Sequence, residues 1–229
     1  SPNFIVYFLQ ILFSFFLFYL LFMKSKNNFF IQELSHLRTG QKEVCLLIHG
    51  YCDSPITFKY LIEELKKQDL DYYALLLPGH GSNFKDLANK TWEDWYHKVE
   101  KNYLDLTKKY ERVWVIGFST GGTLSTYLAE TYPIDGMALI APFLRCPKFL
   151  GISPERIFGL LRQRLPRLQY LKKIFPAGIG EKKLRKEFFE YRYLPVRTTA
   201  SLFDLAEKTR ERLDALQSPI LILHGIHDR

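Results

Sequence analysis

Short apolar runs typical of buried strands alternate with helical segments over most of this 229-residue chain. The runs are almost continuously apolar, and the segments between them repeat apolar residues at helical spacing. Such strands are buried on both faces, as happens where helices cover a mostly parallel sheet. The alternation therefore predicts an α/β fold. The predicted strands are 43–49, 71–77, 112–118, 136–142 and 219–225, and the predicted helices are 57–68, 91–110 and 123–132.

The segment 91–110 has the clearest helical pattern. Thr91 is a favoured residue type for the position that caps a helix N-terminus. The apolar side chains that follow it recur every three or four residues, which places them on one buried face. These positions are Trp92, Trp95, Tyr96, Val99, Tyr103 and Leu106.

The first part of the chain predicts a membrane anchor. Residues 4–23 contain no charge, glycine or proline, and at about 1.5 Å per residue a helix of that length spans a hydrocarbon core of roughly 30 Å. A secretory signal peptide is the alternative, but the segment is longer than a usual apolar signal region and no small-x-small cleavage site follows. We expect a single-pass anchor at 1–26 and one domain at 27–229. The lysines after the span favour the cytoplasmic side for that domain.

The basic charge of the chain is concentrated in one segment. The net charge is +8, yet residues 145–186 alone hold twelve Lys or Arg against two acids. No zinc-finger spacing, phosphate-binding loop or RNA-binding pattern accompanies it, so no nucleic-acid partner is expected. Apolar and basic side chains separate in 157–175, which Pro166 kinks or divides. This segment is either a cap helix with a solvated basic face or an interfacial helix that contacts anionic lipid.

The three cysteines do not suggest a disulfide framework, because their number is odd and small. Cys45 lies within a predicted strand and is expected to be a buried small apolar residue.

Ser119 occupies the position that a catalytic serine requires. In "GFSTGG" it stands between a predicted strand and a predicted helix, with Gly117 and Gly121 two residues away on either side. This context is that of a nucleophile elbow, a sharp turn that exposes the serine hydroxyl. The flanking glycines keep Cβ atoms out of the crowded strand–helix contact. We therefore expect Ser119 to be a nucleophile.

Two further stretches fit acyl-transfer chemistry. Acyl transfer needs backbone N–H groups that stabilise the developing oxyanion. The loop after strand 43–49 and the residue after the nucleophile are the usual donors, which would be the amides of Tyr51 and Thr120. His49 and His80 each lie beside a glycine, where a role in shaping the loop is favoured over proton transfer.

Asp228 is the candidate acid of a catalytic triad. It closely follows the late predicted strand in "SPILILHGIHDR". A carboxylate after a late strand can orient the catalytic histidine, in the chain order Ser, Asp, His.

Together, "HGYCDSP", "LPGHGS", "TWEDW", "GFSTGG" and "SPILILHGIHD" resemble the α/β-hydrolase superfamily, in its carboxylesterase and monoacylglycerol-lipase-like branch, also grouped with serine aminopeptidase-like hydrolases. The resemblance implies a mostly parallel sheet flanked by helices, with a helical cap insertion at about 145–212. It also implies Ser119 as nucleophile, Asp228 as acid, and the amides of Tyr51 and Thr120 as the oxyanion hole. No metal ion or other cofactor is implied.

The sequence departs from the family pattern at the histidine. His224 and His227 lie too close to Asp228 to complete the triad, since adjacent strand residues point to opposite faces. We expect the catalytic histidine beyond Arg229, with the C-terminal part of the fold missing from this chain, which by itself would be inactive or nearly so.

The expected function is hydrolysis of carboxylic esters with apolar acyl chains, such as acylglycerols or lysophospholipids, by a membrane-associated enzyme. A serine aminopeptidase is less favoured because the cap is poor in acids that would hold a substrate ammonium. Epoxide hydrolases and dehalogenases would carry Asp where Ser119 stands. The alternative from another class is a membrane-bound, non-catalytic binding module that retains the hydrolase scaffold. The sequence does not indicate an oligomeric state.

Overall fold

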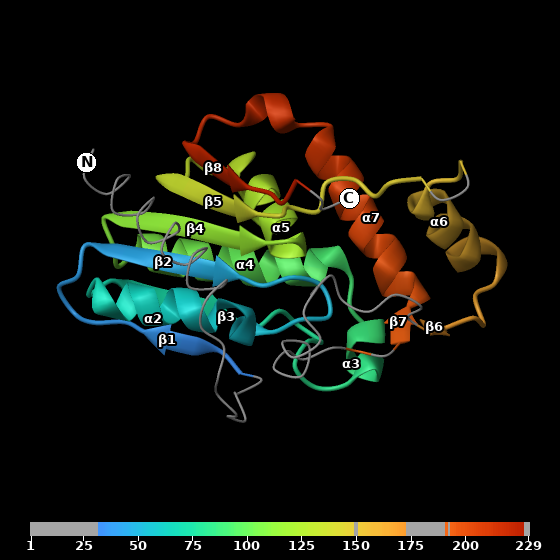
Figure 1. Cartoon of the computed structure of the whole chain (residues 1–229), viewed down its shortest axis with the longest axis horizontal. Helices are drawn as coiled ribbons and strands as arrows, with labels where there is room; N and C mark the ends of the chain where they lie inside the picture. Colours follow the sequence, from blue (N-terminus) through green and yellow to red (C-terminus); the bar gives the residue numbers. More distant parts are fainter. Residues whose placement is uncertain (1–31, 149–150, 173–190, 192, 227–229) are drawn as a thin grey trace.

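The structure, a computed structural model, describes residues 32–148, 151–172, 191 and 193–226. A six-stranded sheet with strand order β1-β3-β2-β4-β5-β8 forms its centre (Figure 1). Every neighbouring pair is parallel except β1 and β3, so the prediction of a mostly parallel sheet is confirmed. The strands are β1 (Leu34–His36), β2 (Glu43–Ile48), β3 (Asp71–Leu75), β4 (Arg112–Phe118), β5 (Gly136–Ile140) and β8 (Ile220–Leu223).

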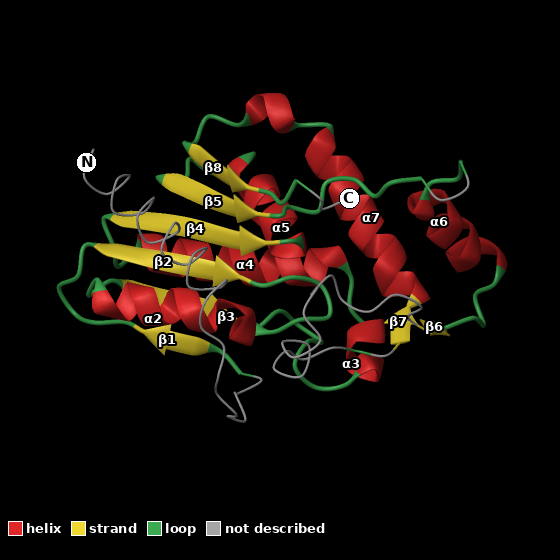
Figure 2. Cartoon of the chain, in the orientation of Figure 1, coloured by secondary structure: helices red, strands yellow, loops and turns green. Residues whose placement is uncertain are grey.

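Helices cover both faces of the sheet (Figures 1 and 2). Alternate residues of β2 supply the two cores, because successive strand side chains point to opposite faces. Cys45 and Leu47 pack beneath α2, whereas Leu46 and Ile48 pack against α4, α5 and α7. The helical segments are η1 (Pro55–Phe58), α2 (Lys59–Lys67), α3 (Phe84–Ala88), α4 (Trp92–Thr107), α5 (Thr120–Ala129), α6 (Pro154–Arg164), α7 (Val196–Arg210) and η3 (Leu213–Ala215).

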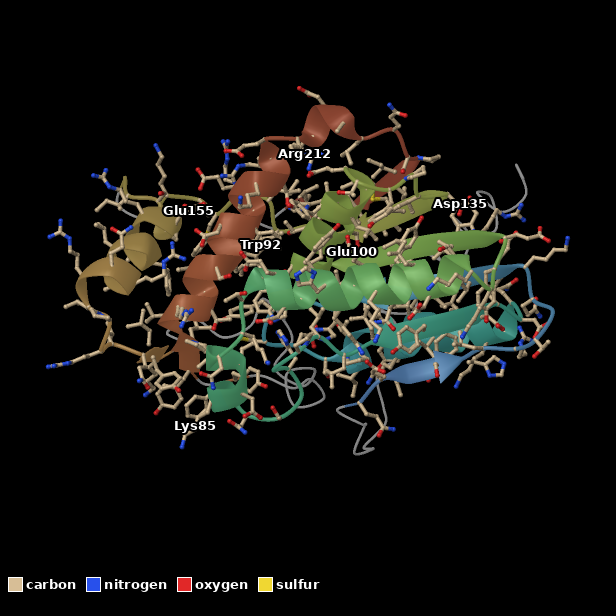
Figure 3. The ribbon with its side chains drawn as sticks, turned by 180° about the vertical axis from the view of Figure 1, so that it is seen from behind. Lys85, Trp92, Glu100, Asp135, Glu155 and Arg212 are labelled. Atoms are coloured by element: carbon tan, nitrogen blue, oxygen red, sulfur yellow. The ribbon has the colours of Figure 1, made fainter. Side chains whose placement is uncertain are left out.

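The prediction for α4 is confirmed in detail. Thr91 is its N-cap residue, and the Thr91 amide donates to the Asp94 carboxylate at 2.9 Å. All six apolar side chains that define the predicted stripe are buried. Figure 3 shows this helix lying across the rear face of the sheet, with Trp92 at its beginning beside α7.

Strand β1 was not predicted, and it fixes where the chain enters the sheet. It runs antiparallel to β3, with Leu34 opposite Ala74 and His36 opposite Tyr72. Its first residue, Leu34, therefore lies near the carboxyl ends of the parallel strands. Ser119, which directly follows β4, lies at the same end of the sheet. Just before β1, Glu33 accepts a hydrogen bond from Tyr73 at 2.5 Å and pairs with Lys98 at 2.7 Å.

A buried carboxylate links β3 to its surroundings. The Asp71 side chain is fully buried, and it accepts hydrogen bonds from the Arg38 amide at 2.6 Å, from Arg38 Nε at 2.7 Å and from the Tyr110 hydroxyl at 2.8 Å. Burial alone would raise the pKa of Asp71, but these hydrogen bonds outweigh it and lower the pKa below its usual value. Asp71 is therefore ionised in the folded protein at neutral pH.

The cap consists of two different parts. Helix α6 has no buried residue, whereas most of α7 is buried against the body. A two-stranded antiparallel sheet of β6 (Tyr170–Lys172) and β7 (Tyr193–Pro195) comes between them in the sequence. The predicted interruption near Pro166 is confirmed, since α6 ends at Arg164. Arg162 of α6 forms a 2.6 Å ion pair with Asp204 of α7.

The predicted anchor, residues 4–23, lies outside the described residues. Within the part that the structure describes, no helix is long and apolar enough to cross a membrane.

Strand β8 forms the edge of the sheet farthest from β1, and it leaves Ile220 38% and Ile222 59% exposed. Cys45 is buried as expected, and burial raises the pKa of its thiol to about 12.

Candidate active site

Ser119 lies in a sharp turn between β4 and α5. Its backbone adopts φ 52° and ψ −116°, a left-handed conformation that is strained for a residue with a side chain. The neighbouring chain holds this turn in place. The Ser119 amide donates to the Ile140 carbonyl at 2.9 Å, and the Ser119 carbonyl accepts from Gly122 at 2.9 Å and Phe143 at 3.1 Å. This backbone geometry is the one that a nucleophile elbow requires.

The glycines on either side of Ser119 are required by close backbone contacts. A Cβ atom on Gly117 would lie 2.4 Å from the Gly121 carbonyl oxygen, and one on Gly121 would lie 1.9 Å from the Ile48 carbonyl oxygen. No ordinary side chain fits at such distances, so α5 can pack this closely on β2 and β4 only with glycine at both positions.

The loop after β2 lies against Ser119. A Cβ atom on Gly50 would be 3.2 Å from the Ser119 Cβ, so the backbone that leads to Tyr51 passes beside the serine. Thr120 is the first residue of α5, and the first amides of a helix have no acceptor within the helix. The fold thus brings Ser119 together with the backbone regions of both predicted oxyanion donors.

His49 shapes the loop that it precedes. Its ring is fully buried, Nε2 accepts a hydrogen bond from the Leu77 amide at 3.0 Å, and Nδ1 is 2.9 Å from the Gly50 carbonyl. Since Nε2 accepts, Nδ1 carries the proton and donates. Burial holds the pKa of His49 well below its usual value. With both nitrogens occupied, this neutral ring is not available as the base for Ser119.

His80 is buried in the same region. Its Nδ1 lies 3.2 Å from the Pro78 carbonyl, which also accepts from Trp95 Nε1 at 3.1 Å. The ring contacts the edges of His49 and Trp95 at centroid distances of 5.0 and 5.5 Å. Burial lowers the pKa of His80 to about 4, so the ring is neutral at pH 7. These contacts agree with a role in organising the loop.

The remaining predicted site residue, Asp228, lies outside the described residues. Among those that are described, no group of three or more His, Cys, Asp or Glu side chains is arranged to hold a metal ion.

One contact of the Tyr51 side chain was not predicted from the sequence. The Tyr51 hydroxyl lies 2.9 Å from Thr199 Oγ1 of α7, although 148 residues separate the two. Tyr51 was selected only for its amide, and Thr199 had no motif to mark it. The one available signal was the polar run "RTTAS" inside an otherwise helical segment.

The sequence matches one known protein family over most of its length. Residues 39–229 match the family described as serine aminopeptidase, S33. The chain belongs to this family. It is 31% identical over 184 residues to a thermostable monoacylglycerol lipase from Bacillus sp. (strain H-257), a match covering 80% of this chain and 69% of the relative. It is also 27% identical over 191 residues to a carboxylesterase from Bacillus subtilis (strain 168), covering 82% and 73% of the two chains. Among the members of the family, the chain is thus a serine hydrolase of the esterase and lipase type.

Solved structures support the fold independently. A monoacylglycerol lipase from Paleococcus ferrophilus superimposes with a TM-score of 0.65 at 20% identity, covering 84% of this chain and 76% of that one. A soluble variant of monoglyceride lipase from Saccharomyces cerevisiae gives a TM-score of 0.67 at 20% identity, with 86% and 72% covered. At these identities the likeness establishes the α/β-hydrolase fold alone.

Proposed function

We propose that this S33-family protein hydrolyses carboxylic esters with apolar acyl chains, such as acylglycerols or lysophospholipids, with Ser119 as the nucleophile. The observation that carries the proposal is the strained backbone of Ser119, at φ 52°, flanked by glycines at which an added Cβ would clash with backbone atoms. Relatives named as a monoacylglycerol lipase and a carboxylesterase support an ester as the bond that is cleaved.

In the proposed reaction, Ser119 Oγ attacks the ester carbonyl while a histidine takes its proton. The amides of Tyr51 and Thr120 stabilise the oxyanion, and each such donor contributes on the order of 3 kcal/mol. The histidine then protonates the leaving alcohol, and water hydrolyses the acyl-enzyme by the same steps. Asp228 orients the histidine and stabilises its charged form.

The catalytic histidine in this proposal is a residue other than His49, because both nitrogens of the His49 ring are engaged within the fold.

The test is covalent labelling of the full-length protein with a fluorophosphonate probe. Wild type should be labelled, Ser119→Ala should not, and Ser153→Ala, which removes only the N-cap of α6, should be labelled like wild type. A non-catalytic binding module would leave wild type unlabelled. Labelling of the Ser119→Ala variant would assign the nucleophile elsewhere.

The family description also brings a peptidase into consideration. Relatives named as a monoacylglycerol lipase and a carboxylesterase favour the ester, and Asp204 of the cap is paired with Arg162 at 2.6 Å. We therefore expect p-nitrophenyl butyrate to be hydrolysed much faster than an amino-acid p-nitroanilide. A preference for the anilide would reverse this assignment.

We further propose that residues 4–23 anchor the protein in a membrane, so that the edge of the sheet that carries Ser119 faces lipid. The direction of β1 supports this, because it joins the preceding segment to that edge. Helix α6 lies beyond the same edge (Figure 1), and its exposed surface combines Leu160 with Arg156 and Arg164, a composition suited to an anionic interface.

Deletion of residues 1–26 tests both parts of this proposal. The full-length protein should remain in the membrane fraction through high-salt and carbonate washes, and the deletion variant should not. The deletion variant should still bind phosphatidylserine vesicles at low salt, at about 1 kcal/mol per basic residue near the surface. Equal binding to neutral and anionic vesicles would remove α6 from the proposed interface.

A further inference from the structure

The hydroxyl of Tyr51 joins the loop of the oxyanion hole to the cap. It lies 2.9 Å from Thr199 Oγ1, and Thr199 Oγ1 donates its own hydrogen to the Pro195 carbonyl at 2.8 Å. Because that hydrogen is already used, the Tyr51 hydroxyl must be the donor in the pair. Burial raises the pKa of Tyr51 well above its usual value, so the hydroxyl keeps its proton. A chain of two hydrogen bonds thus runs from Tyr51 through α7 to β7.

The direction of this bond decides which group of Tyr51 can face substrate. The phenol bonds Thr199 and has Cys52 as a second hydrogen-bonding neighbour, and the ring packs against Trp95 and His80 at centroid distances of 5.7 and 6.1 Å. These contacts hold the side chain between α7 and the body of the protein. Only the backbone amide remains to stabilise an oxyanion, and its direction depends on where the side chain is held.

Helix α7 provides a rigid support for this contact. Four of its hydroxyl side chains are buried, and three of them bond different segments outside the helix. Thr198 donates to the Leu87 carbonyl at 2.9 Å, and Ser201 accepts from the Trp92 amide at 2.8 Å. Thr199, at 5% exposure, makes the third bond and is the only one of the three that contacts the loop beside Ser119.

We propose that Thr199 is a positioning residue for the oxyanion hole, which it acts on through the Tyr51 hydroxyl. The proposal rests on the ester-hydrolase function stated above. If the loop after β2 is fixed by packing, the Tyr51 amide needs no reorganisation when the oxyanion forms. If the loop is mobile, part of the stabilisation is lost to ordering the loop in the transition state. Loss of the Thr199 hydroxyl should therefore lower kcat and leave KM nearly unchanged.

The matched variants are Thr199→Val and Thr198→Val. Both remove a buried hydroxyl from α7 while keeping its shape, but only the first breaks the contact with Tyr51. For the full-length protein with p-nitrophenyl butyrate, we expect about a tenfold fall in kcat for Thr199→Val, which is less than the 10²–10³-fold cost of losing a donor outright. Thr198→Val should lower the Tm about as much as Thr199→Val does, and it should keep kcat within about twofold of wild type.

Two more variants separate positioning from general stability. Thr199→Ser retains the hydroxyl and should restore kcat. Tyr51→Phe should reproduce the loss, and the double variant Tyr51→Phe/Thr199→Val should lose no more than either single variant, because all three lack the same bond.

The outcomes distinguish this proposal from the function that it assumes. Absence of fluorophosphonate labelling and of ester hydrolysis in wild type would refute both. Labelled variants in which Thr199→Val and Thr198→Val lose kcat equally, or in which the losses of Tyr51→Phe and Thr199→Val multiply, would overturn the positioning role alone.

Discussion

Substitution of Gly121 by alanine should move both halves of the oxyanion hole. The added Cβ would lie 1.9 Å from the Ile48 carbonyl oxygen, 2.5 Å from its carbon and 2.7 Å from the His49 carbonyl oxygen. All three are backbone atoms, so no side chain can rotate away. Since Cβ contacts essentially never fall below 3.0 Å, α5 and β2 must separate by at least 1.1 Å, the difference between 3.0 and 1.9 Å.

This separation acts directly on the proposed chemistry. Thr120 begins α5 and Tyr51 follows β2 in the chain, so the two amides would move apart. A misplacement of about 1 Å can cost about 100-fold in rate. Overpacking of this kind costs about 1–3 kcal/mol of stability, which for a chain of this size corresponds to a fall in Tm of roughly 2–12 °C.

The assay is the rate of fluorophosphonate labelling of the folded full-length protein, with the Tm from circular dichroism. Gly159→Ala is the control, because Gly159 lies within α6 and an added Cβ there has no atom within 4 Å. It should be labelled at the wild-type rate and gain up to about 1 kcal/mol from the better helix former. The reasoning is refuted if Gly121→Ala keeps both the wild-type labelling rate and the wild-type Tm.

Two buried carboxyl groups give further predictions. Asp71→Asn should lower the free energy of unfolding by about 2 kcal/mol at pH 7, since hydrogen bonds to charged groups are worth about 1.5–3 kcal/mol. The fold lowers the pKa of Asp71. In urea titrations the difference between the two proteins should therefore disappear as the pH falls below 3.8, the usual pKa of an aspartate. Glu130 is 8% exposed, and burial, opposed by Arg212, raises its pKa from 4.5 to about 7. Wild type therefore loses stability as the pH rises through 7, so Glu130→Gln should be more stable by up to about 3 kcal/mol at pH 8, with little difference at pH 4; a difference independent of pH would show that Glu130 is not the group responsible.

The sequence predicts the central sheet and the serine turn because both depend on local patterns. Buried parallel strands need continuous apolar runs, and the elbow needs glycine on both sides of Ser119, so each leaves a local signal. The pairs Gly117–Gly121 and Gly121–Ile48 then explain physically why the pattern is required. The roles of Tyr51 and Thr120 stay predictions, which the fold supports by placing their backbone beside Ser119.

Features that depend on distant partners left no readable signal. Strand β1 has only three residues, Leu34, Ser35 and His36, and two of them are exposed. Its sequence therefore shows no apolar pattern. Helix α7 falls within the predicted cap, at about 145–212, because that stretch is a long insertion between two predicted strands, and no motif marks its hydroxyl residues. They are buried because Thr198, Thr199 and Ser201 bond specific partners that lie 109 to 148 residues away in the sequence.

Helix α6 is held to the protein less tightly than α7, which determines where a substrate can most easily reach Ser119. Helix α6 is held to α7 by a contact between the tilted rings of Phe158 and Phe203, whose centroids lie 5.7 Å apart, and by the half-exposed pair of Arg162 and Asp204. Such an aromatic contact contributes about 0.5–1.5 kcal/mol and such a pair at most about 1 kcal/mol. Moving α7 would instead leave three buried polar contacts unmade, at about 1–3 kcal/mol each, and expose core side chains. An opening for an apolar acyl chain therefore costs least at α6, while α7 keeps the Tyr51 loop in place throughout.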